Sequence, residues 1–493
     1  NQEIAVGYLS LGDSARFREY TTRTAAFLRD LPYAEELRPA YGHVARMYAY
    51  DEKDLPEAKR WLEALENMAT QYHDLRALGD AHFSAAGIMR QSGDSTGAIS
   101  RLHKAIDILA RIGDTPHQAW CLGHLGVAYL TMGDLAADEE SSFKQLEFSQ
   151  THDHYEGMAT AHWLLSQVRF CQGDGDKAVR AVKEAIELYR RAENRWSEGG
   201  SLYLLGRYLF ALGERSAALE QFKEAVPRVD LETLRQETMA LAVVFNSIEA
   251  MYDDAGAFRS LCAEWRESYP ALNESLLVQW YLEPAKIKAD QGAVVFEDEF
   301  ADVLSPGWTW IDPADDCWFR VQQGLEIHAA NERGLWQINL GAPRVLRPVS
   351  DDWAIQTACS AMGEAACGGL LVWKDRESYL RLDVGTGGAH EVFFASCIEN
   401  QDAVIGRGRL PEGLHLQSAP QAVHLRIERT GERVRALCSG DDETWFLVGE
   451  THLAATEGIQ VGLYANGEID RVVHPGAHTD GTAIRFLSFR QWK

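Results

Sequence analysis

Apolar residues recur with the 3.6-residue period of amphipathic helices over about the first 290 residues, and turn signals interrupt them at regular intervals. A Gly-Asp pair, or a close relative of it, recurs every 40 residues at Gly93-Asp94, Gly133-Asp134, Gly173-Asp174 and Gly213-Glu214. The same frame reaches Lys53-Asp54 and Asp253-Asp254, and a further pair, Gly12-Asp13, lies one residue out of frame. The pattern predicts about seven 40-residue units of helix, turn and helix over residues 1–290.

Other positions keep step with these turns. Alanines follow the turns at Ala58, Ala98, Ala178 and Ala218 and again at Ala105, Ala185 and Ala225, and leucines precede them at Leu125, Leu165 and Leu205. Small residues let two helices approach closely, and the leucines give each helix an apolar stripe. Because one such pair cannot bury its apolar face alone, we expect the pairs to stack into an all-α superhelical solenoid.

The segment GHLGVAYLTMGDLAADEESSFKQLEF (123–148) shows the unit most clearly, with a small residue at Gly126, an aromatic residue at Tyr129, the turn, and a second helix. Gly206 and Tyr208 repeat these features. The pattern resembles the tetratricopeptide repeat, in the long 40-residue variant of bacterial signal-transduction ATPase sensors. The chain begins inside a repeat, so we expect upstream sequence, and the uncapped first repeat leaves self-association open.

In tetratricopeptide arrays the first helix of each pair lines the groove, so the resemblance implies a set of groove residues. These are Phe83, Arg90, Trp163, Phe170, Tyr203, Arg207 and Phe210. An aromatic stripe with two guanidinium groups could stack on a sugar or hold a peptide. The alternative is that these aromatic side chains fill the space between adjacent repeats.

After residue 293 the pattern changes to short alternating runs between turn residues, which predicts β-strands. We therefore place a linker at residues 291–293 and an all-β domain at 294–493. The candidate strands are residues 294–300, 317–322, 324–329, 353–361, 368–375, 379–384, 390–397, 422–430, 433–440, 444–450, 459–466 and 483–491. So many short strands predict a two-sheet sandwich.

The second part also carries a family resemblance, in a fixed order of motifs. They are FEDEF (296–300), Trp308, GGLLVWKDRESYLRL (368–382), LRIERTGERVRALCSGDDETW (425–445) and VGLYA (461–465). Together they resemble the concanavalin-A-like lectin and glucanase superfamily, which implies a jelly-roll sandwich. That superfamily contains lectins, accessory modules and glycosidases, so the resemblance leaves the function open.

Catalysis on this fold would need two carboxylates about 5–5.5 Å apart on one strand. Glu297 and Glu299 would share a face, but they lie in the opening strand of the domain. Glu468 and Asp470 have the right spacing, and no third acid follows them. We interpret these acids as solvated edge or turn residues and expect no enzyme activity.

A sugar-binding module needs an exposed aromatic side chain with hydrogen-bonding groups beside it. The candidates are Trp336, Trp373, Tyr379, Arg381 and Trp445. Trp373 and Tyr379 flank one hairpin, so they could share a face. The alternative is that these residues lie in the core between the sheets, as we expect for Trp318 and Trp353.

Metal and cofactor signals are weak. His152-Asp153-His154 lies between helices, His474 and His478 flank a Pro-Gly turn, and Gly385–Gly388 is a turn between strands. Asp441-Asp442-Glu443 could coordinate Ca²⁺, although a polar hairpin tip explains it equally well. We therefore expect no resident metal or cofactor, with calcium as the one open alternative.

The formal net charge of −25 disfavours nucleic acid and anionic membranes as direct partners. No apolar run approaches the roughly 18 residues that a transmembrane helix needs. The eight cysteines form no Cys-x-x-Cys pair, which favours a reduced, cytoplasmic setting and leaves a Cys359–Cys367 disulfide open.

These features favour a non-catalytic sensor or scaffold that binds a protein partner or a small ligand, as the C-terminal recognition part of a larger bacterial signalling protein. The alternative is a carbohydrate-binding protein that acts through its sandwich and takes an oligosaccharide. A glycosidase is the third hypothesis.

Overall fold

The structure is a computed structural model that describes residues 14–30, 34–50, 53–228, 255–268, 285–289, 292–362, 365–385, 388–409, 422–454, 457–471 and 474–493. The chain divides into two compact units, which are described separately. The first holds residues 1–194 with Trp336–Asn339, and the second holds the remainder. The predicted turns Gly12-Asp13 and Asp253-Asp254, and part of the predicted linker, lie outside the described residues.

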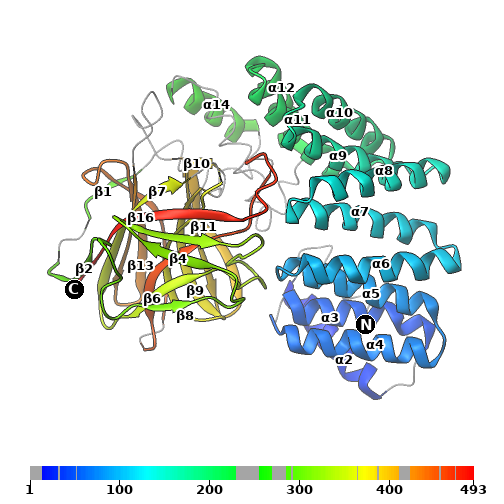
Figure 1. Cartoon of the computed structure of the whole chain (residues 1–493), viewed down its shortest axis with the longest axis horizontal. Coiled ribbons are helices and arrows are strands. Elements are labelled where there is room, and N and C mark those ends of the chain that lie inside the picture. Colours follow the sequence, from blue (N-terminus) through cyan, green and yellow to red (C-terminus); the bar gives the residue numbers. More distant parts are fainter. Residues whose placement is uncertain are drawn as a thin grey trace. The chain divides into compact units, whose positions relative to one another are not determined.

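Successive helices of the first unit pack against one another in chain order (Figure 1). They are α2 (Ser14–Asp30), η1 (Glu35–Leu37), α3 (Arg38–Tyr50), α4 (Leu55–Gln71), α5 (Leu75–Gln91), α6 (Ser95–Ile112), α7 (Thr115–Met132), α8 (Leu135–Thr151), α9 (Tyr155–Cys171) and α10 (Gly175–Arg191). The second unit contains α11 (Arg195–Ala211), α12 (Arg215–Ala225), η2 (Val226–Arg228) and α14 (Ala255–Ser268).

The turns between these helices recur every 20 residues, twice as often as the sequence signal. Each has a residue with positive φ, at Lys53, His73, Gly93, Gly113, Gly133, Asp153, Gly173, Glu193 and Gly213. The next residue often caps the following helix: Asp74 accepts a hydrogen bond from the Ala77 amide at 2.9 Å, and Asp94 one from the Gly97 amide at 2.8 Å. Glycine favours positive φ, and aspartate satisfies an amide of the first helical turn, so Gly-Asp punctuates the array.

Helix α8 departs from the other second helices of the array. Where they bury Ala58, Ala98, Ala178 and Ala218, α8 buries Asp138. Its other buried side chains, Ser141, Ser142, Gln145 and Ser149, are also polar. Across from them α7 carries glycine: a Cβ at Gly123 would lie 2.8 Å from Gln145 Nε2, and one at Gly126 would lie 3.1 Å from Asp138 Oδ1. A polar layer therefore replaces the alanine–leucine packing at this repeat.

The strands of the second unit form two antiparallel sheets packed as a sandwich (Figure 1). The nine-stranded sheet has the order β1-β14-β13-β12-β7-β16-β5-β4, with β2 also paired to β16. Its strands are β1 (Lys286–Ile287), β2 (Val294–Asp298), β4 (Trp318–Val321), β5 (Leu325–Ala329), β7 (Trp353–Met362), β12 (Val423–Thr430), β13 (Arg433–Ser439), β14 (Trp445–His452) and β16 (Thr482–Trp492).

The seven-stranded sheet has the order β11-β10-β9-β8-β15-β6-β3. Its strands are β3 (Thr309–Ile311), β6 (Arg344–Pro348), β8 (Gly368–Asp375), β9 (Ser378–Gly385), β10 (Gly388–Ile398), β11 (Gln401–Arg409) and β15 (Gln460–Ala465). Every predicted strand is present, and β1, β3, β6 and β11 are additional to the prediction.

Alternation along the strands builds the core of the sandwich. In β5, Leu325, Ile327 and Ala329 are buried, while Glu326 and His328 lie on the other face. We call the face of the nine-stranded sheet that carries Glu326 its outer face. Trp353 is buried as predicted. The prediction for Trp318 was wrong: its side chain lies on the outer face of edge strand β4 and is 44% exposed.

None of the described helices has the length and hydropathy to span a membrane. The eight cysteines form no disulfide, and Cys359 and Cys367 are both buried. Burial raises the pKa of the Cys359 and Cys438 thiols well above their ordinary value. These two thiols are therefore protonated core residues.

Candidate functional site

The predicted groove residues of the first unit lie on two first helices, α5 and α9. Phe83 and Arg90 on α5, and Trp163 and Phe170 on α9, are all half-buried. The Phe83 ring meets the His124 ring of α7 edge-on, with centroids 5.0 Å apart. Trp163 packs against the cluster of Ala159, Ala185 and Tyr189. These aromatic side chains thus fill space between helices and still keep part of their surface in solvent.

The surface of α3, α5 and α7 is rich in cationic and aromatic groups. Burial, with the nearby guanidinium groups of Arg90 and Arg46, lowers the pKa of His124 to about 4. Burial raises the pKa of Tyr50, and the same two arginines oppose that rise. At neutral pH His124 is therefore an uncharged imidazole within the field of two arginines.

The remaining predicted groove residues, Tyr203, Arg207 and Phe210, are half-buried on α11 in the second unit. The Tyr203 ring lies 5.9 Å from the Phe222 ring of α12. A Cβ at Gly206 would lie 2.6 Å from the Phe222 ring, so the small residue in this first helix makes room for that ring.

Three of the five sandwich candidates, Trp373, Tyr379 and Arg381, lie on one face of the seven-stranded sheet. Trp373 and Tyr379 are cross-strand partners of β8 and β9, and their rings stack with centroids 5.5 Å apart. The Arg344 guanidinium lies 4.3 Å from the Trp373 ring centroid. The prediction of an exposed platform is corrected, however, because Tyr379 is 1% and Arg381 4% exposed.

The other two candidates lie elsewhere. Trp445 begins β14 of the nine-stranded sheet and is only 6% exposed, so it too is a core residue. Trp336 is half-buried and forms a β-bridge with Asn339. These five residues therefore do not converge on one sugar-binding surface.

On the same face as Tyr379 the seven-stranded sheet buries a polar group. Arg381 and Asp383 lie 3.8 Å apart on β9, and the Tyr464 hydroxyl of β15 donates a hydrogen bond to Asp383. Burial, followed by the Asp383 charge, holds the pKa of Tyr464 well above its ordinary value. The phenol therefore stays protonated and supplies a donor to a buried carboxylate.

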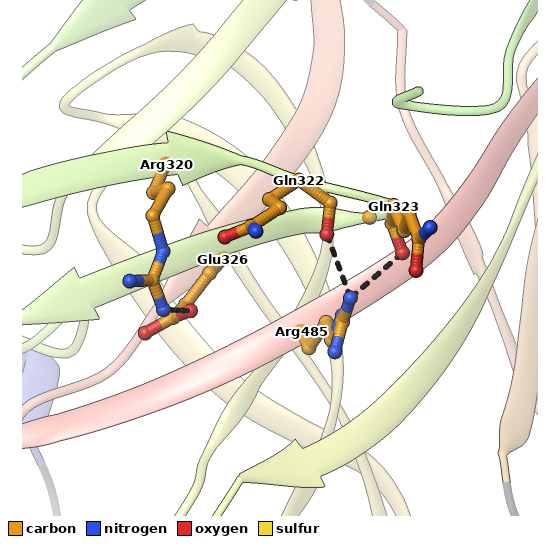
Figure 2. Close-up of a pocket in the computed structure, with 6 residues that line it drawn as sticks. Arg320, Gln322, Gln323, Glu326 and Arg485 are labelled. Atoms are coloured by element: carbon orange, nitrogen blue, oxygen red, sulfur yellow. Dashed lines mark hydrogen bonds and ion pairs between the residues drawn. The ribbon is translucent and has the colours of Figure 1, made fainter. Parts of the chain in front are cut away.

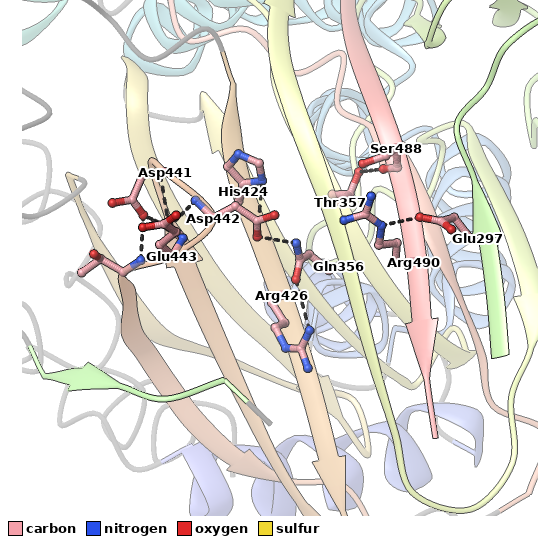
Figure 3. Close-up of polar contacts among 12 residues, drawn as sticks. Glu297, Gln356, Thr357, His424, Arg426, Asp441, Asp442, Glu443, Ser488 and Arg490 are labelled. Atoms are coloured by element: carbon pink, nitrogen blue, oxygen red, sulfur yellow. Dashed lines mark hydrogen bonds and ion pairs between the residues drawn. The ribbon is translucent and has the colours of Figure 1, made fainter. Parts of the chain in front are cut away.

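The outer face of the nine-stranded sheet carries a second polar row, formed by Glu297, Arg490, Gln356 and Arg426 on four neighbouring strands (Figure 3). Arg490 contacts Glu297 at 2.5 Å and Glu299 at 3.3 Å. The hydrogen bond from Arg490 lowers the pKa of Glu297. A glycosidase general acid needs a raised pKa, so this pair does not have that property.

At one end of this row, Arg426 belongs to a buried ion cluster, and Gln356 contacts the hairpin tip that contains Asp442. Arg426 contacts Glu428 at 2.6 Å, and Arg435 also pairs with Glu428. Gln356 accepts from Arg426 at 3.1 Å and donates to Asp442 at 2.7 Å (Figure 3). Ion pairs and hydrogen bonds between neighbouring side chains thus link the strands on this face.

In the Asp441-Asp442-Glu443 hairpin tip, the first carboxylate accepts hydrogen bonds from the turn itself. Asp441 accepts hydrogen bonds from the Thr444 amide at 2.7 Å and the Glu443 amide at 2.9 Å. The bond from the Thr444 amide is the main reason why its pKa is lowered. These bonds account for the carboxylate as a turn cap, and calcium binding at the tip stays a prediction.

One metal-like cluster was not predicted. Ligand atoms of Asp312, Asp316 and Cys317 all lie within 4.8 Å of one another. Arg333 already neutralises Asp316 at 2.5 Å, and burial raises the pKa of the Cys317 thiol to about 12. Asp316 thus pairs with Arg333, and Asp312 accepts a hydrogen bond from the Cys317 amide at 2.8 Å, so both carboxylates have structural partners.

Three of the four histidines singled out in the sequence, His152, His154 and His474, have local structural partners, whereas the buried Nε2 of His478 has no hydrogen-bond partner among the described residues. His154 caps α9 by accepting from the Gly157 amide at 3.0 Å, and His152 Nδ1 lies 2.8 Å from the Phe148 carbonyl oxygen. His474 Nε2 lies 3.0 Å from the Gly385 carbonyl oxygen, and burial lowers its pKa.

A polar pocket of about 220 Å³ opens where β4, β5 and β16 lie side by side (Figure 2). It is lined by Arg320, Gln322, Gln323, Gly324, Glu326 and Arg485. Glu326 is the cross-strand partner of both Arg320 and Arg485, and it forms an ion pair with Arg320 at 2.5 Å. Sequence reasoning missed this site because its residues meet only through the sheet register.

Trp318 extends the pocket along the same face. It precedes Arg320 by two residues on β4, so both side chains lie on the outer face. Its indole ring is parallel to the His328 imidazole, with an interplanar angle of 5° and centroids 4.9 Å apart. An exposed indole therefore lies next to a group of hydrogen-bonding side chains.

The tetratricopeptide repeat family model matches residues 157–229, and no curated protein matches the chain significantly. A signal transduction ATPase with numerous domains and a tetratricopeptide repeat sensor, from Pyrococcus horikoshii, is 17% identical at a TM-score of 0.43, over 56% of this chain and 42% of that one.

Two further similar structures concern the sandwich. A xylan β-1,4-xylosidase from Bacillus halodurans is 17% identical at a TM-score of 0.32, over 42% of this chain and 40% of that one. A carbohydrate-binding module from Bacillus subtilis is 17% identical at a TM-score of 0.25, over 38% and 96%. The chain thus spans well under half the length of the xylosidase and of the ATPase. The chain combines an array of helical repeats, of which residues 157–229 match the tetratricopeptide repeat model, with a two-sheet β-sandwich.

Proposed function

We propose that this chain is a non-catalytic recognition protein, the sensor or scaffold part of a larger regulatory assembly, and that its repeat array binds a protein partner. The observation that carries the proposal is the surface of α3, α5 and α7. It combines the half-buried ring of Phe83 with the guanidinium groups of Arg46 and Arg90 around a neutral His124.

This chemistry favours a particular kind of partner. Guanidinium groups recognise carboxylates through two parallel hydrogen bonds, and an aromatic side chain adds contact area at a low cost in side-chain entropy. The chain as a whole carries a net charge of −25, so it repels an acidic segment except at a local cationic surface. We therefore propose a partner segment that carries carboxylates together with at least one apolar side chain.

The absence of catalysis is part of the proposal. Arg490 holds Glu297 and Glu299, and the lowered pKa of Glu297 suits an ion pair better than acid catalysis. We expect no release of reducing sugar from xylan or arabinoxylan, and no change on Glu297→Gln. Sugar release that Glu297→Gln abolishes would contradict this part of the proposal.

A second candidate function is saccharide binding by the sandwich. It is favoured by the exposed Trp318 indole beside the pocket of Arg320, Glu326 and Arg485. Sugar-binding sites combine an aromatic platform with a few polar groups in this way. This candidate concerns a different surface, so both functions could belong to one protein.

The test of the first function is quantitative capture of partners from a lysate, followed by titration of the purified partner. We would compare the natural chain with a Phe83→Ala/Arg90→Gln variant. A matched control, Arg60→Gln/Phe143→Ala, changes exposed residues on the second helices α4 and α8. We expect the first variant to weaken binding about ten-fold or more and the control to leave it unchanged. A partner that depends on the control residues instead would contradict the proposal.

A further inference from the structure

We infer that the pocket between β4, β5 and β16 is a subsite for an acidic saccharide, with a sugar ring on Trp318 and a uronate carboxylate at Arg485. This inference rests on the second candidate function and adds to it the ligand class and the orientation. Four observations carry it: the arrangement of charges, the position of Arg485, the exposed indole and the size of the pocket.

The arrangement of charges comes from the sheet register. Arg320, Glu326 and Arg485 are consecutive cross-strand neighbours on one face, so the row reads positive, negative, positive. Glu326 is committed to Arg320 at 2.5 Å. The three side chains therefore sum to one positive charge, which favours an anionic group over a neutral one.

The second observation is how Arg485 is held. Its guanidinium group donates to the carbonyl oxygens of Gln322 at 2.7 Å and Gln323 at 2.8 Å (Figure 2). These acceptors are neutral, so they fix the group without cancelling its charge. Gly324 has a φ of +139°, and a Cβ there would lie 2.7 Å from Arg485 Nε, so the turn has glycine where the arginine passes.

The third observation is the Trp318 platform. His328 stacks on one side of the indole, and the ring keeps 44% of its surface in solvent. The C–H face of a pyranose can pack on such a ring. At roughly 3.3 Å per residue, the chain from Trp318 to Gln322 is about 13 Å long. This length is greater than the length of one sugar ring.

The size of the pocket and the neighbouring charges orient the ligand. The volume of about 220 Å³ is below the roughly 300–1,000 Å³ of sites that enclose a drug-sized molecule. It therefore accepts one end of a saccharide. Arg485 is held by neutral carbonyl acceptors and keeps its charge, so the acidic end of the ligand belongs at the Arg485 side.

The test is calorimetric titration of the full chain with trigalacturonate, trimannuronate and a hyaluronan tetrasaccharide, beside neutral cellotriose and xylotriose. We expect at least one uronate ligand to bind, with about ten-fold or greater preference over the neutral ligands and weaker binding at high salt. Arg485→Gln and Trp318→Ala should each weaken binding about ten-fold or more. Arg376→Gln and Trp196→Ala are controls at exposed sites elsewhere and should bind normally.

The outcomes separate this inference from the function on which it rests. Equal binding of neutral and acidic saccharides that Trp318→Ala weakens would overturn the acidic class and keep saccharide binding. Binding of no saccharide by the folded chain would overturn both. Poly-glutamate that competes as well as the uronates would show an acidic-peptide site and overturn the inference. Arg485→Lys keeps the charge, and thermal unfolding of each variant would show that a loss of binding is not a loss of fold.

Discussion

The carboxylate of Asp138 accepts a hydrogen bond from the Ser142 hydroxyl at 2.9 Å inside the repeat array, with both side chains fully buried. The corresponding residues of the neighbouring second helices are Ala98 and Leu102 in α6, and Ala178 and Val182 in α10. The other carboxylate oxygen of Asp138, Oδ2, is buried and has no hydrogen-bond partner. Burial raises the pKa of Asp138 to about 7.

The first prediction concerns the pH dependence of stability. The pKa of Asp138 rises from 3.8 in the unfolded chain to about 7 in the fold, so the native state binds this proton more tightly than the unfolded state does. The free energy of unfolding should therefore fall as the pH rises from about 4 to 7 and level off above that. Asp138→Ala should raise it by roughly 1–3 kcal/mol at pH 8, because a buried charge is removed. Urea unfolding at several pH values measures this.

The control for this prediction is Asp138→Asn, which keeps a polar side chain of the same size without titrating. It should flatten the pH dependence between 4 and 7. If the natural chain and both variants share the same pH slope, Asp138 is not the group responsible.

The second prediction concerns the turns of the array. Glu193 has a φ of 56° and Gly133 one of 78°. A left-handed conformation costs a non-glycine residue roughly 1–2 kcal/mol, so Glu193→Gly should stabilise by about 0.5–1 kcal/mol and Gly133→Ala should destabilise by a similar amount. Denaturant midpoints measure both. Two changes of the same sign would show that backbone conformation does not dominate at these turns.

The third prediction contrasts two ion pairs of the nine-stranded sheet. Glu428 is buried and pairs with Arg426 and Arg435, whereas Glu297 is exposed and pairs with Arg490. Glu428→Gln should destabilise by roughly 3 kcal/mol or more, because it leaves buried guanidinium charge uncompensated. Glu297→Gln should cost only about 0–1 kcal/mol. Thermal unfolding of the two variants measures the difference, and equal losses would contradict the burial argument.

The fourth prediction concerns the Tyr464 hydroxyl. Tyr464→Phe removes the hydrogen bond that Asp383 accepts in the seven-stranded sheet. We expect a loss of roughly 1–3 kcal/mol, because the buried carboxylate loses a donor. A Tyr464→Phe/Asp383→Asn double variant should lose less than the sum of the two single changes. Additive losses would mean that the two groups act independently.

The periodicity of the sequence predicted the array but only half of its turns. Gly93, Gly133, Gly173 and Gly213 gave the 40-residue signal, whereas His73, Asp153 and Glu193 adopt the same backbone conformation without glycine. The Gly113-Asp114 turn carries the same pair and was missed because it lies between two turns of the 40-residue frame, whereas the other three missed turns lack the glycine that marked the frame. The polar layer of α8 had a visible signal, since Asp138 stands where the repeat otherwise has alanine.

In the sandwich, alternation predicted the strands but not which faces are covered. The run Tyr379-Leu380-Arg381-Leu382 looks half-exposed, yet β9 is buried on both faces. Trp318 looks like a core residue, yet it lies on an edge strand. Strands such as β11, Gln401–Arg409, are polar and glycine-rich and gave no pattern. The pocket depends on the register that pairs Glu326 with Arg485, and a sequence pattern does not fix that register.

The most direct test of recognition through the repeat array is hydrogen–deuterium exchange of the chain with and without its purified protein partner. We expect binding to slow exchange in the first helices α3, α5 and α7, with the largest effect between Leu75 and Gln91. Protection confined to the second helices α4, α6 and α8, or to the sandwich, would contradict recognition through the first-helix surface.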